Sequence, residues 1–188
     1  MKTKAFLIFL VALMIGFSSA YAQGFQAPAE GKAVVYFTRI TAYGGTTSFE
    51  YFHNDKYIGI FNKKNYMRYE LDPGEQLLWA SSENKEFVTT DLKAGGTYII
   101  LIDVIMGAMK ARVGMTPITA TDERFARVKE LINEQPPVVT TEKKIAEMNK
   151  KLEKFIPETL EKYNTIWKAE KNFKHISADM AIPEDMLK

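Results

Sequence analysis

Cysteine is absent from the 188 residues of this sequence. The fold therefore cannot depend on disulfides, and the burial of apolar and aromatic side chains must stabilise it. The absence also excludes thiol chemistry, iron–sulfur clusters and cysteine zinc sites. A bacterial lipoprotein is excluded as well, because its lipid is attached to a cysteine.

Histidine is scarce, with only His53 and His175. They form no H-x-H or H-E-x-x-H spacing, so the sequence predicts no metal site, and no motif indicates a cofactor. Ser81 and Ser82 lack the G-x-S-x-G context of a hydrolase nucleophile. We therefore identify no catalytic residue and expect a protein that is not an enzyme.

An excess of charge of either sign is also lacking. The chain has 25 Lys and Arg against 23 Asp and Glu, a formal net charge of +2. Lys2 and Lys4 lie in a segment that we expect to be removed, which leaves 25 − 2 = 23 basic residues against 23 acidic ones. This balance does not indicate the basic surface that nucleic-acid binding needs, so we expect no nucleic-acid partner.

Long hydrophobic runs are missing except at the amino terminus. Lys2 and Lys4 precede the apolar residues 5–17, and Ala20-Tyr21-Ala22 supplies the small side chains that a signal peptidase needs. The pattern predicts a signal peptide over residues 1–22, with cleavage before Gln23. An uncleaved membrane anchor is the alternative, but the apolar run is shorter than the roughly 20 residues of a spanning helix. We expect an exported protein, periplasmic or secreted, with no transmembrane segment after cleavage and no lipid anchor.

Residues 32–118 consist of short alternating or apolar runs separated by turn residues. We expect a mainly β fold with an α tail, of the α+β class: a small antiparallel β-sandwich of about seven or eight strands, then a C-terminal helical region. That helical region should cover residues 119–188, and residues 23–31 should form a flexible lead-in. The predicted strands are residues 32–39, 47–53, 57–62, 66–71, 75–82, 86–92, 97–106 and 108–115.

Three turns are predicted to join neighbouring strands into hairpins. They are Asn54-Asp55-Lys56, Asp72-Pro73-Gly74 and Ala94-Gly95-Gly96, whose residues tolerate the positive or fixed φ that tight turns need. The strand over residues 97–106 is apolar at each position from Tyr98 to Ile102. Both of its faces should therefore be covered, as in a central strand on which the helical tail packs.

After Pro117 the apolar period changes to that of helices. One helix is expected to begin at Thr121-Asp122-Glu123 and to end at Pro136-Pro137, and Thr141 should cap a second one. Pro157 should kink that second helix or begin a new one. The second helix has one apolar face, formed by Ile145, Met148, Leu152, Ile156, Leu160, Tyr163 and Trp167.

Aromatic residues are plentiful, with 12 Phe, 9 Tyr and 2 Trp. Most of those in the strand region must be core, because a protein without disulfides has few other large groups to bury. Four tyrosines could instead form an exposed patch that contacts a glycan, a peptide or a protein. These candidate contact residues are Tyr43, Tyr57, Tyr66 and Tyr69.

Three runs of the strand region carry a family resemblance: EYFHNDKYIG at residues 50–59, YMRYELDPGE at 66–75 and LKAGGTY at 92–98. Over about residues 31–115 the chain resembles an exported bacterial family, domain of unknown function 2846, which is similar in plan to PEGA-type domains. Glu75 stands where PEGA-like units often have histidine, and the helical tail is not part of that plan. The resemblance implies a PEGA-like β-sandwich at the cell envelope, and it carries no activity or functional residues.

Together, these observations favour a non-enzymatic envelope protein that binds or scaffolds, with an envelope protein or a glycan as its partner. One alternative is an enzyme whose catalytic groups converge in space rather than in sequence. A pocket with titratable groups between apolar walls would favour it. The other alternative is a membrane-associated structural protein that uses the apolar face of its second helix, and an exposed apolar stripe would favour that one.

Overall fold

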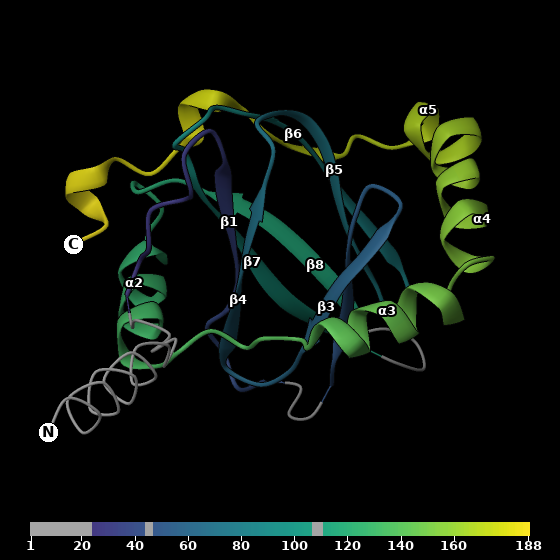
Figure 1. Cartoon of the computed structure of the whole chain (residues 1–188), viewed down its shortest axis with the longest axis horizontal. Helices are drawn as coiled ribbons and strands as arrows, with labels where there is room; N and C mark the ends of the chain where they lie inside the picture. Colours follow the sequence, from purple (N-terminus) through teal and green to yellow (C-terminus); the bar gives the residue numbers. More distant parts are fainter. Residues whose placement is uncertain (1–23, 44–46, 107–110) are drawn as a thin grey trace, which may run out of the picture.

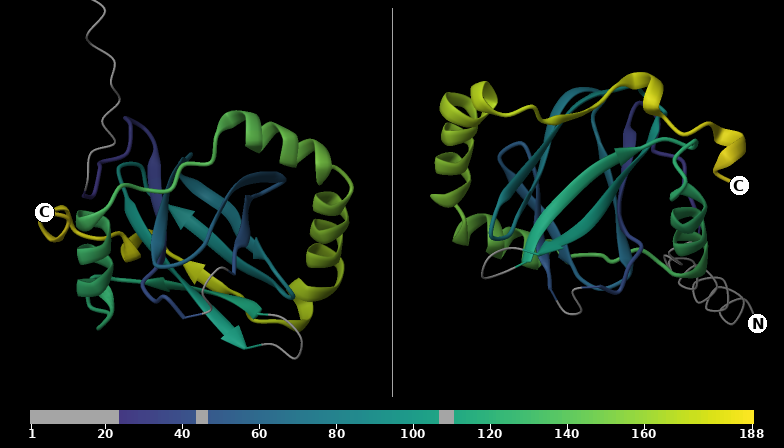
Figure 2. Two further views of the ribbon diagram at one scale, coloured as in Figure 1. Left: turned by 90° about the horizontal axis from the view of Figure 1, so that it is seen from below. Right: turned by 180° about the vertical axis from the view of Figure 1, so that it is seen from behind.

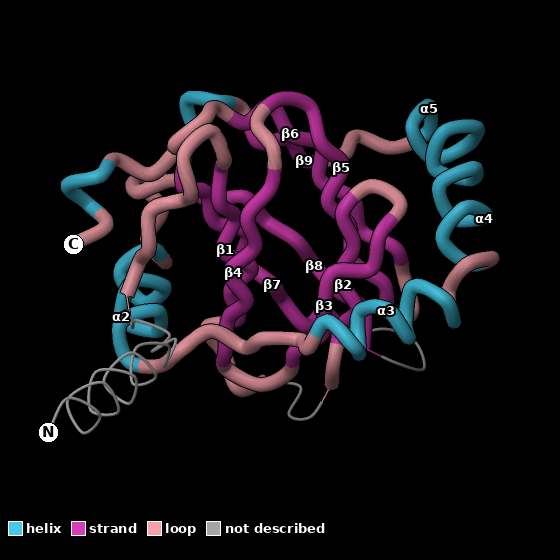
Figure 3. Tube along the Cα trace, viewed as in Figure 1, coloured by secondary structure: helices cyan, strands magenta, loops and turns pink. Residues whose placement is uncertain are grey.

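Two β-sheets packed face to face form the centre of the computed structural model (Figures 1 and 3). The structure describes residues 24–43, 47–106 and 111–188. Sheet 1 has the strand order β4-β1-β7-β8, and sheet 2 has the order β3-β2-β5-β6-β9. The strands are β1 (Ala33–Arg39), β2 (Phe49–His53), β3 (Lys56–Phe61), β4 (Asn65–Leu71), β5 (Gly74–Ser81), β6 (Lys85–Leu92), β7 (Thr97–Met106), β8 (Ala111–Ile118) and β9 (Lys174–Ile176).

The predicted mainly β fold with a helical tail is confirmed. All eight predicted strands are present with small shifts of their ends, although residues 107–110, which include the start of the last one, lie outside the described residues. The strands and their pairing directions differ in part from the prediction. The tail, predicted as helical only, contributes the short strand β9, and two pairings, β1 with β7 and β6 with β9, are parallel rather than antiparallel.

One of the three predicted hairpins is confirmed and two are wrong. β2 and β3 pair as expected around Asn54, which has a φ of 49°. β4 and β5 lie in different sheets, and so do β6 and β7, so the turns at Gly74 and Gly95 carry the chain from one sheet to the other. Both glycines have positive φ, which fits the predicted turn chemistry but does not determine which strand becomes the partner.

Strand β7 is covered on both faces from Tyr98 to Ile102, as predicted. Tyr98, Ile100 and Ile102 pack between the sheets, whereas Ile99 and Leu101 point to the outer side of sheet 1. The first helix of the tail, α2 (Phe125–Glu134), covers that outer side with a face of buried side chains. These are Phe125, Val128, Leu131 and Ile132.

Residues 142–173 of the tail cover the opposite side of the sandwich, so α2 and α4 lie on opposite sides of it (Figure 2). Two 3-10 turns, η2 (Ala178–Met180) and η3 (Glu184–Met186), follow β9 on the other side, where Ile182 and Leu187 join the cluster of α2. The helices that cover sheet 2 are α3 (Glu142–Lys151), α4 (Phe155–Lys162), the π-helix η1 (Tyr163–Trp167) and α5 (Lys168–Glu170). Their apolar face packs on outward-facing aromatic side chains of sheet 2 rather than on β7. The exposed stripe that would favour a membrane-associated protein is therefore not seen there. No helix in the described ranges is long and apolar enough to cross a membrane.

The caps and breaks of the tail follow local sequence signals. Thr141 accepts a hydrogen bond from the backbone N–H of Lys144 and so caps α3, as predicted. The predicted long helix is interrupted after Lys151, and α4 begins at Phe155 with Pro157 in its first turn. A proline there removes no hydrogen bond, because the first N–H groups of a helix have no partner within it.

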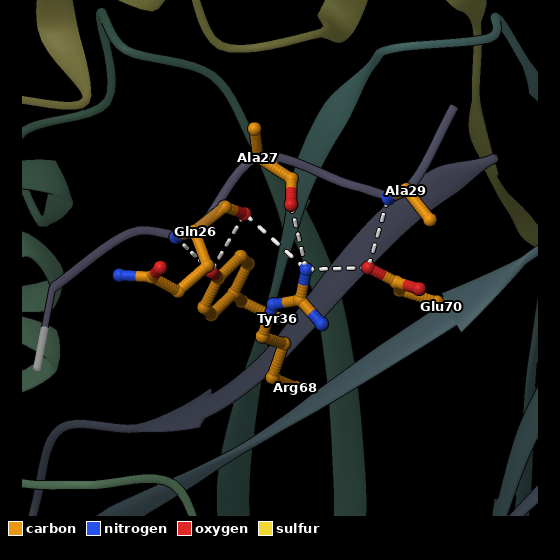
Figure 4. Close-up of polar contacts among 6 residues, drawn as sticks. All are labelled: Gln26, Ala27, Ala29, Tyr36, Arg68 and Glu70. Carbon is orange, nitrogen blue, oxygen red and sulfur yellow. Dashed lines mark hydrogen bonds and ion pairs between the residues drawn. The ribbon is translucent and has the colours of Figure 1, made fainter. Parts of the chain in front are cut away.

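The segment before β1 was predicted to be a flexible lead-in, but its described part is held on sheet 1 (Figure 4). The N–H of Gln26 donates to the hydroxyl of Tyr36 at 2.8 Å. Arg68 donates to the carbonyl of Ala27 at 2.9 Å and to the carboxylate of Glu70 at 2.6 Å. An arginine and a tyrosine that project from the sheet thus fix the backbone that leads into it.

Asp122 stands before α2 and accepts hydrogen bonds from the side chain of Arg124, at 2.8 Å, and from its backbone N–H, at 2.9 Å. The Arg124 side-chain hydrogen bond is the main reason that the pKa of Asp122 falls from its ordinary 3.8 to about 2. Because the folded-state pKa is the lower one, this carboxylate stabilises the fold above its unfolded pKa and loses that effect as the pH falls through about 2.

We therefore expect an NMR titration of the Asp122 carboxyl carbon to show a midpoint near pH 2. Arg124→Gln should move the midpoint toward 3.8. A wild-type midpoint already at the ordinary value would mean that the pair does not form in solution.

Candidate binding pocket

The four tyrosines predicted as contact residues do not share one surface. Tyr57 and Tyr66 are each only 1% exposed, and Tyr69 is partly buried, whereas Tyr43 is 58% exposed. Burial raises the pKa of Tyr57 and the pKa of Tyr66 to about 12. The prediction of one exposed patch formed by all four is therefore wrong.

The tail explains the burial of two of these tyrosines. The backbone N–H of Tyr57 donates to the side chain of Asn149 in α3 at 2.9 Å. The hydroxyl of Tyr66 donates to the carbonyl of Gln135, just after α2, at 2.9 Å. Both tyrosines lie on outer sheet faces, which would be exposed if the tail did not pack over them.

The two histidines are held by neighbouring side chains. The ring nitrogens of His53 lie 3.0 Å from the hydroxyl of Tyr69 and 2.8 Å from the amide oxygen of Gln76. His175, in β9, lies with its Nδ1 2.9 Å from the hydroxyl of Thr89. Among the described residues, no group of three or more His, Asp or Glu side chains could hold a metal ion.

A pocket of about 440 Å³ lies where the turn between β5 and β6 meets α4, η1 and the chain after α5. We call it the tail pocket. Its lining combines aromatic, basic, acidic and neutral polar side chains from the sandwich and from the tail. These are Phe155, Trp167 and Phe173; Lys85, Arg112, Lys162 and Lys171; Glu83, Glu86 and Glu158; Asn84 and Thr159.

Phe87 anchors the aromatic wall of this pocket. It is fully buried on the outer face of β6, and its ring centroid lies 5.8 Å from that of Trp167 and 5.4 Å from that of Phe173. It also stacks on Tyr163 at 4.6 Å. Tyr163 and Trp167 are the ends of η1, a single π-helical turn of a kind that is rare and frequently found at functional sites.

Lys85 is a half-buried cation of the pocket. Its ammonium donates to the carbonyl of Ser82 at 3.4 Å and lies 5.4 Å from the ring centroid of Phe155. It forms no ion pair with any residue in the described part of the chain. Burial lowers the pKa of Lys85, and the nearby ammonium of Lys162 lowers it further, against an opposing effect of Glu50.

Glu86 is a partly buried carboxylate in the same pocket as Lys85. Its side chain is 29% exposed, and its carboxylate lies 3.8 Å from the ammonium of Lys174. Burial raises the pKa of Glu86, although Lys174, Lys171 and Arg112 each oppose the shift. The pocket therefore holds one desolvated cation and one desolvated carboxylate.

Asn84 fixes the turn that carries both charged residues. Its amide nitrogen donates to the carbonyl of Val113 in β8 at 2.8 Å, and its amide oxygen accepts from the N–H of Val113 at 2.8 Å. This pair of bonds ties sheet 2 to sheet 1 at the rim of the pocket. Lys85 and Glu86 follow Asn84 directly, so their backbone is held in place. This favours a pre-formed site.

A second hollow, of about 600 Å³, lies on the other side of Tyr163. Its lining is mostly polar and includes Gln76, Thr89 and His175. The histidine and the threonine bond to each other there, as described above. We take the tail pocket as the candidate site, because it combines an aromatic wall with a cation that has no ion pair in the described structure.

Sequence reasoning did not find this pocket. Its lining comes from the β5–β6 turn, from β8 and from the tail, which are far apart in the sequence. Elsewhere in the tail, apolar and charged residues lie on separate faces. Near the pocket, Phe155, Trp167 and Phe173 are mixed with lysines, and this mixture was the signal in the sequence for a site there. That signal is weak without knowledge of which strand the tail covers.

Comparison of the sequence with models of known protein families gives no match, and no curated protein matches the chain either. The resemblance to the exported bacterial family stays a prediction. The geometry of the tail pocket therefore provides the basis for a functional proposal.

Proposed function

We propose that this chain is an exported protein of the cell envelope that binds a small ligand, or one unit of a larger one, in the tail pocket without transforming it. The observation that supports binding is the pocket itself, with its aromatic wall and its half-buried Lys85. Export is supported by the signal-peptide pattern of residues 1–22, and the envelope by the resemblance given above.

The pocket has the properties of a small-molecule site. Its volume of about 440 Å³ lies within the ~300–1,000 Å³ typical of ligand pockets. Phe155 and Trp167 offer apolar contact area, while a few charged groups can fix the orientation of a ligand. Because one wall belongs to the sandwich and the other to the tail, the site exists only when the tail is docked.

Tryptophan fluorescence can test whether ligands enter this pocket. The chain has two tryptophans, of which Trp79 is fully buried and Trp167 lines the pocket. We expect at least one fraction of a bacterial envelope extract, separated into glycan and peptide pools, to change the emission of residues 23–188 saturably. Trp167→Phe should remove that change.

A matched pair of variants locates the binding. Glu158→Tyr places an aromatic ring at the rim of the pocket, and Glu161→Tyr places the same ring on α4 outside the lining. We expect only Glu158→Tyr to abolish binding of the active fraction. Equal binding by both variants, or no active fraction at all, would contradict the proposal.

A second candidate function is an enzyme that acts in the same pocket. It is favoured by the opposite pKa shifts of Lys85 and Glu86, since groups with shifted pKa values cluster at catalytic sites. Mass spectrometry of the ligand after a long incubation separates the two functions. An unchanged ligand supports binding, whereas a conversion that Glu86→Gln abolishes supports catalysis.

A further inference from the structure

The charges that line the tail pocket are not balanced. Four basic side chains face three carboxylates, a surplus of 4 − 3 = 1 positive charge. Burial lowers the pKa of Lys85, Glu50 opposes that shift without an ion pair among the described residues, and Lys162 adds to it. Lys171 lies over the ring of Trp167 at 5.3 Å. A half-buried cation that has no ion pair among the described residues costs free energy, which an incoming anion would offset.

The size of the surplus limits the charge of the ligand. A phosphate ester carries nearly two negative charges at neutral pH, and the carboxylates of Glu86 and Glu158 would repel the second of them. A single carboxylate matches the surplus of one. The pocket therefore favours a monoanion over a phosphorylated compound.

The carboxylates of the lining indicate what else the ligand carries. Glu158 is exposed at the rim, and Glu86 is partly buried. Carboxylates form short, strong hydrogen bonds with hydroxyl donors. A ligand with several hydroxyl groups would satisfy these acceptors, whereas a simple aromatic acid would leave them facing its ring.

The aromatic wall of the tail pocket is held rigidly by the sandwich. Trp167 and Phe173 both contact Phe87, so their rings are held in place before any ligand arrives. A sugar ring has an apolar face of C–H groups that can lie on such a wall, while its hydroxyls point sideways to polar groups.

We propose that the tail pocket binds a sugar acid, a pyranose ring with one carboxylate such as a uronic acid unit of an envelope glycan. The carboxylate lies by Lys85 and Lys162, the apolar ring face lies on Trp167, and Glu86 and Glu158 accept from the hydroxyls. This inference rests on the binding function proposed above and adds the class of ligand.

Calorimetry or NMR titration with matched glycosides tests the inference. The probes are the methyl glycosides of glucuronic and galacturonic acid, the neutral methyl glucoside and galactoside, and benzoate. We expect at least one uronide to bind about tenfold or more tighter than its neutral partner, with a difference that shrinks as salt rises. Benzoate should bind more weakly than that uronide.

Lysine variants provide the second part of the test. Lys85→Met keeps most of the buried side-chain volume and should weaken uronide binding about tenfold while leaving the neutral glycoside unchanged. Lys162→Met, on the exposed surface of α4, should act in the same direction if Lys85→Met does not fold. Lys150→Met, on α3 outside the pocket lining, is the matched control and should have no effect.

Each outcome separates the ligand class from the binding function. Equal affinity for uronide and neutral glycoside, or tighter binding of benzoate, overturns the sugar-acid inference. If an envelope fraction binds in the pocket but no uronide does, the inference fails and the binding function stands. If neither binds, both fail.

Discussion

Trp79→Ala is expected to lower the free energy of unfolding by about 3–5 kcal/mol. The side chain is fully buried on the outer face of sheet 2, where its ring stacks on Phe52 with 3.7 Å between centroids. Its indole N–H donates to the carbonyl of Asn54 at 2.9 Å. Truncation would leave a cavity beneath the tail and a carbonyl without its donor, and urea titration followed by circular dichroism measures the loss.

The loss of unfolding free energy in Trp79→Ala can be compared with the loss in Trp167→Ala. Trp167 is only partly buried, so its truncation should cost about 1–2 kcal/mol. The tail docks on sheet 2 mainly through fully buried rings and much less through the pocket wall. A loss at Trp79 below that at Trp167 would show that this outer face is not a second core.

Leu131→Ala is expected to cost about 2–5 kcal/mol, because Leu131 is fully buried between α2 and the outer face of sheet 1. Urea titration again gives the magnitude. Hydrogen exchange should also accelerate in β7, whose Ile99 and Leu101 share this cluster.

Glu130→Ala is the matched control on the same helix. Glu130 is exposed, so the change should stay within about 0.5 kcal/mol of the wild type. If Leu131→Ala were equally mild, α2 would be an appendage and not a layer of the fold.

The strands were predictable because alternation of apolar and polar residues depends only on the local chain. Their partners were not. The turns before β5 and after β6 have the residues of tight hairpin turns, but both connect the two sheets. Positive φ at Gly74 or Gly95 reverses the chain equally well in a hairpin and in an arch between sheets.

The candidate site was beyond sequence reasoning for a related reason. Tyr57 and Tyr66 have the pattern of outward-facing strand residues, and only the packed tail makes them core. The strand β9 has three residues, too few for any period to show. The lining of the tail pocket combines Lys85 of the sandwich with Trp167 and Phe173 of the tail. The pocket therefore forms only when β9 and α4 pack on sheet 2.

The parallel pairing of β1 with β7 also has a consequence for the time at which the chain can fold. β1 is the first strand of the described residues to be synthesised, yet its parallel neighbour β7 ends at Met106. Sheet 2 gains its last strand only at Ile176, and Ile182 then bonds to the carbonyl of Thr97. Sheet 1 can therefore be complete once β8 has emerged at Ile118, whereas sheet 2 has to wait for almost all of the chain. The chain therefore completes sheet 2 and its helical cover only near the end of synthesis.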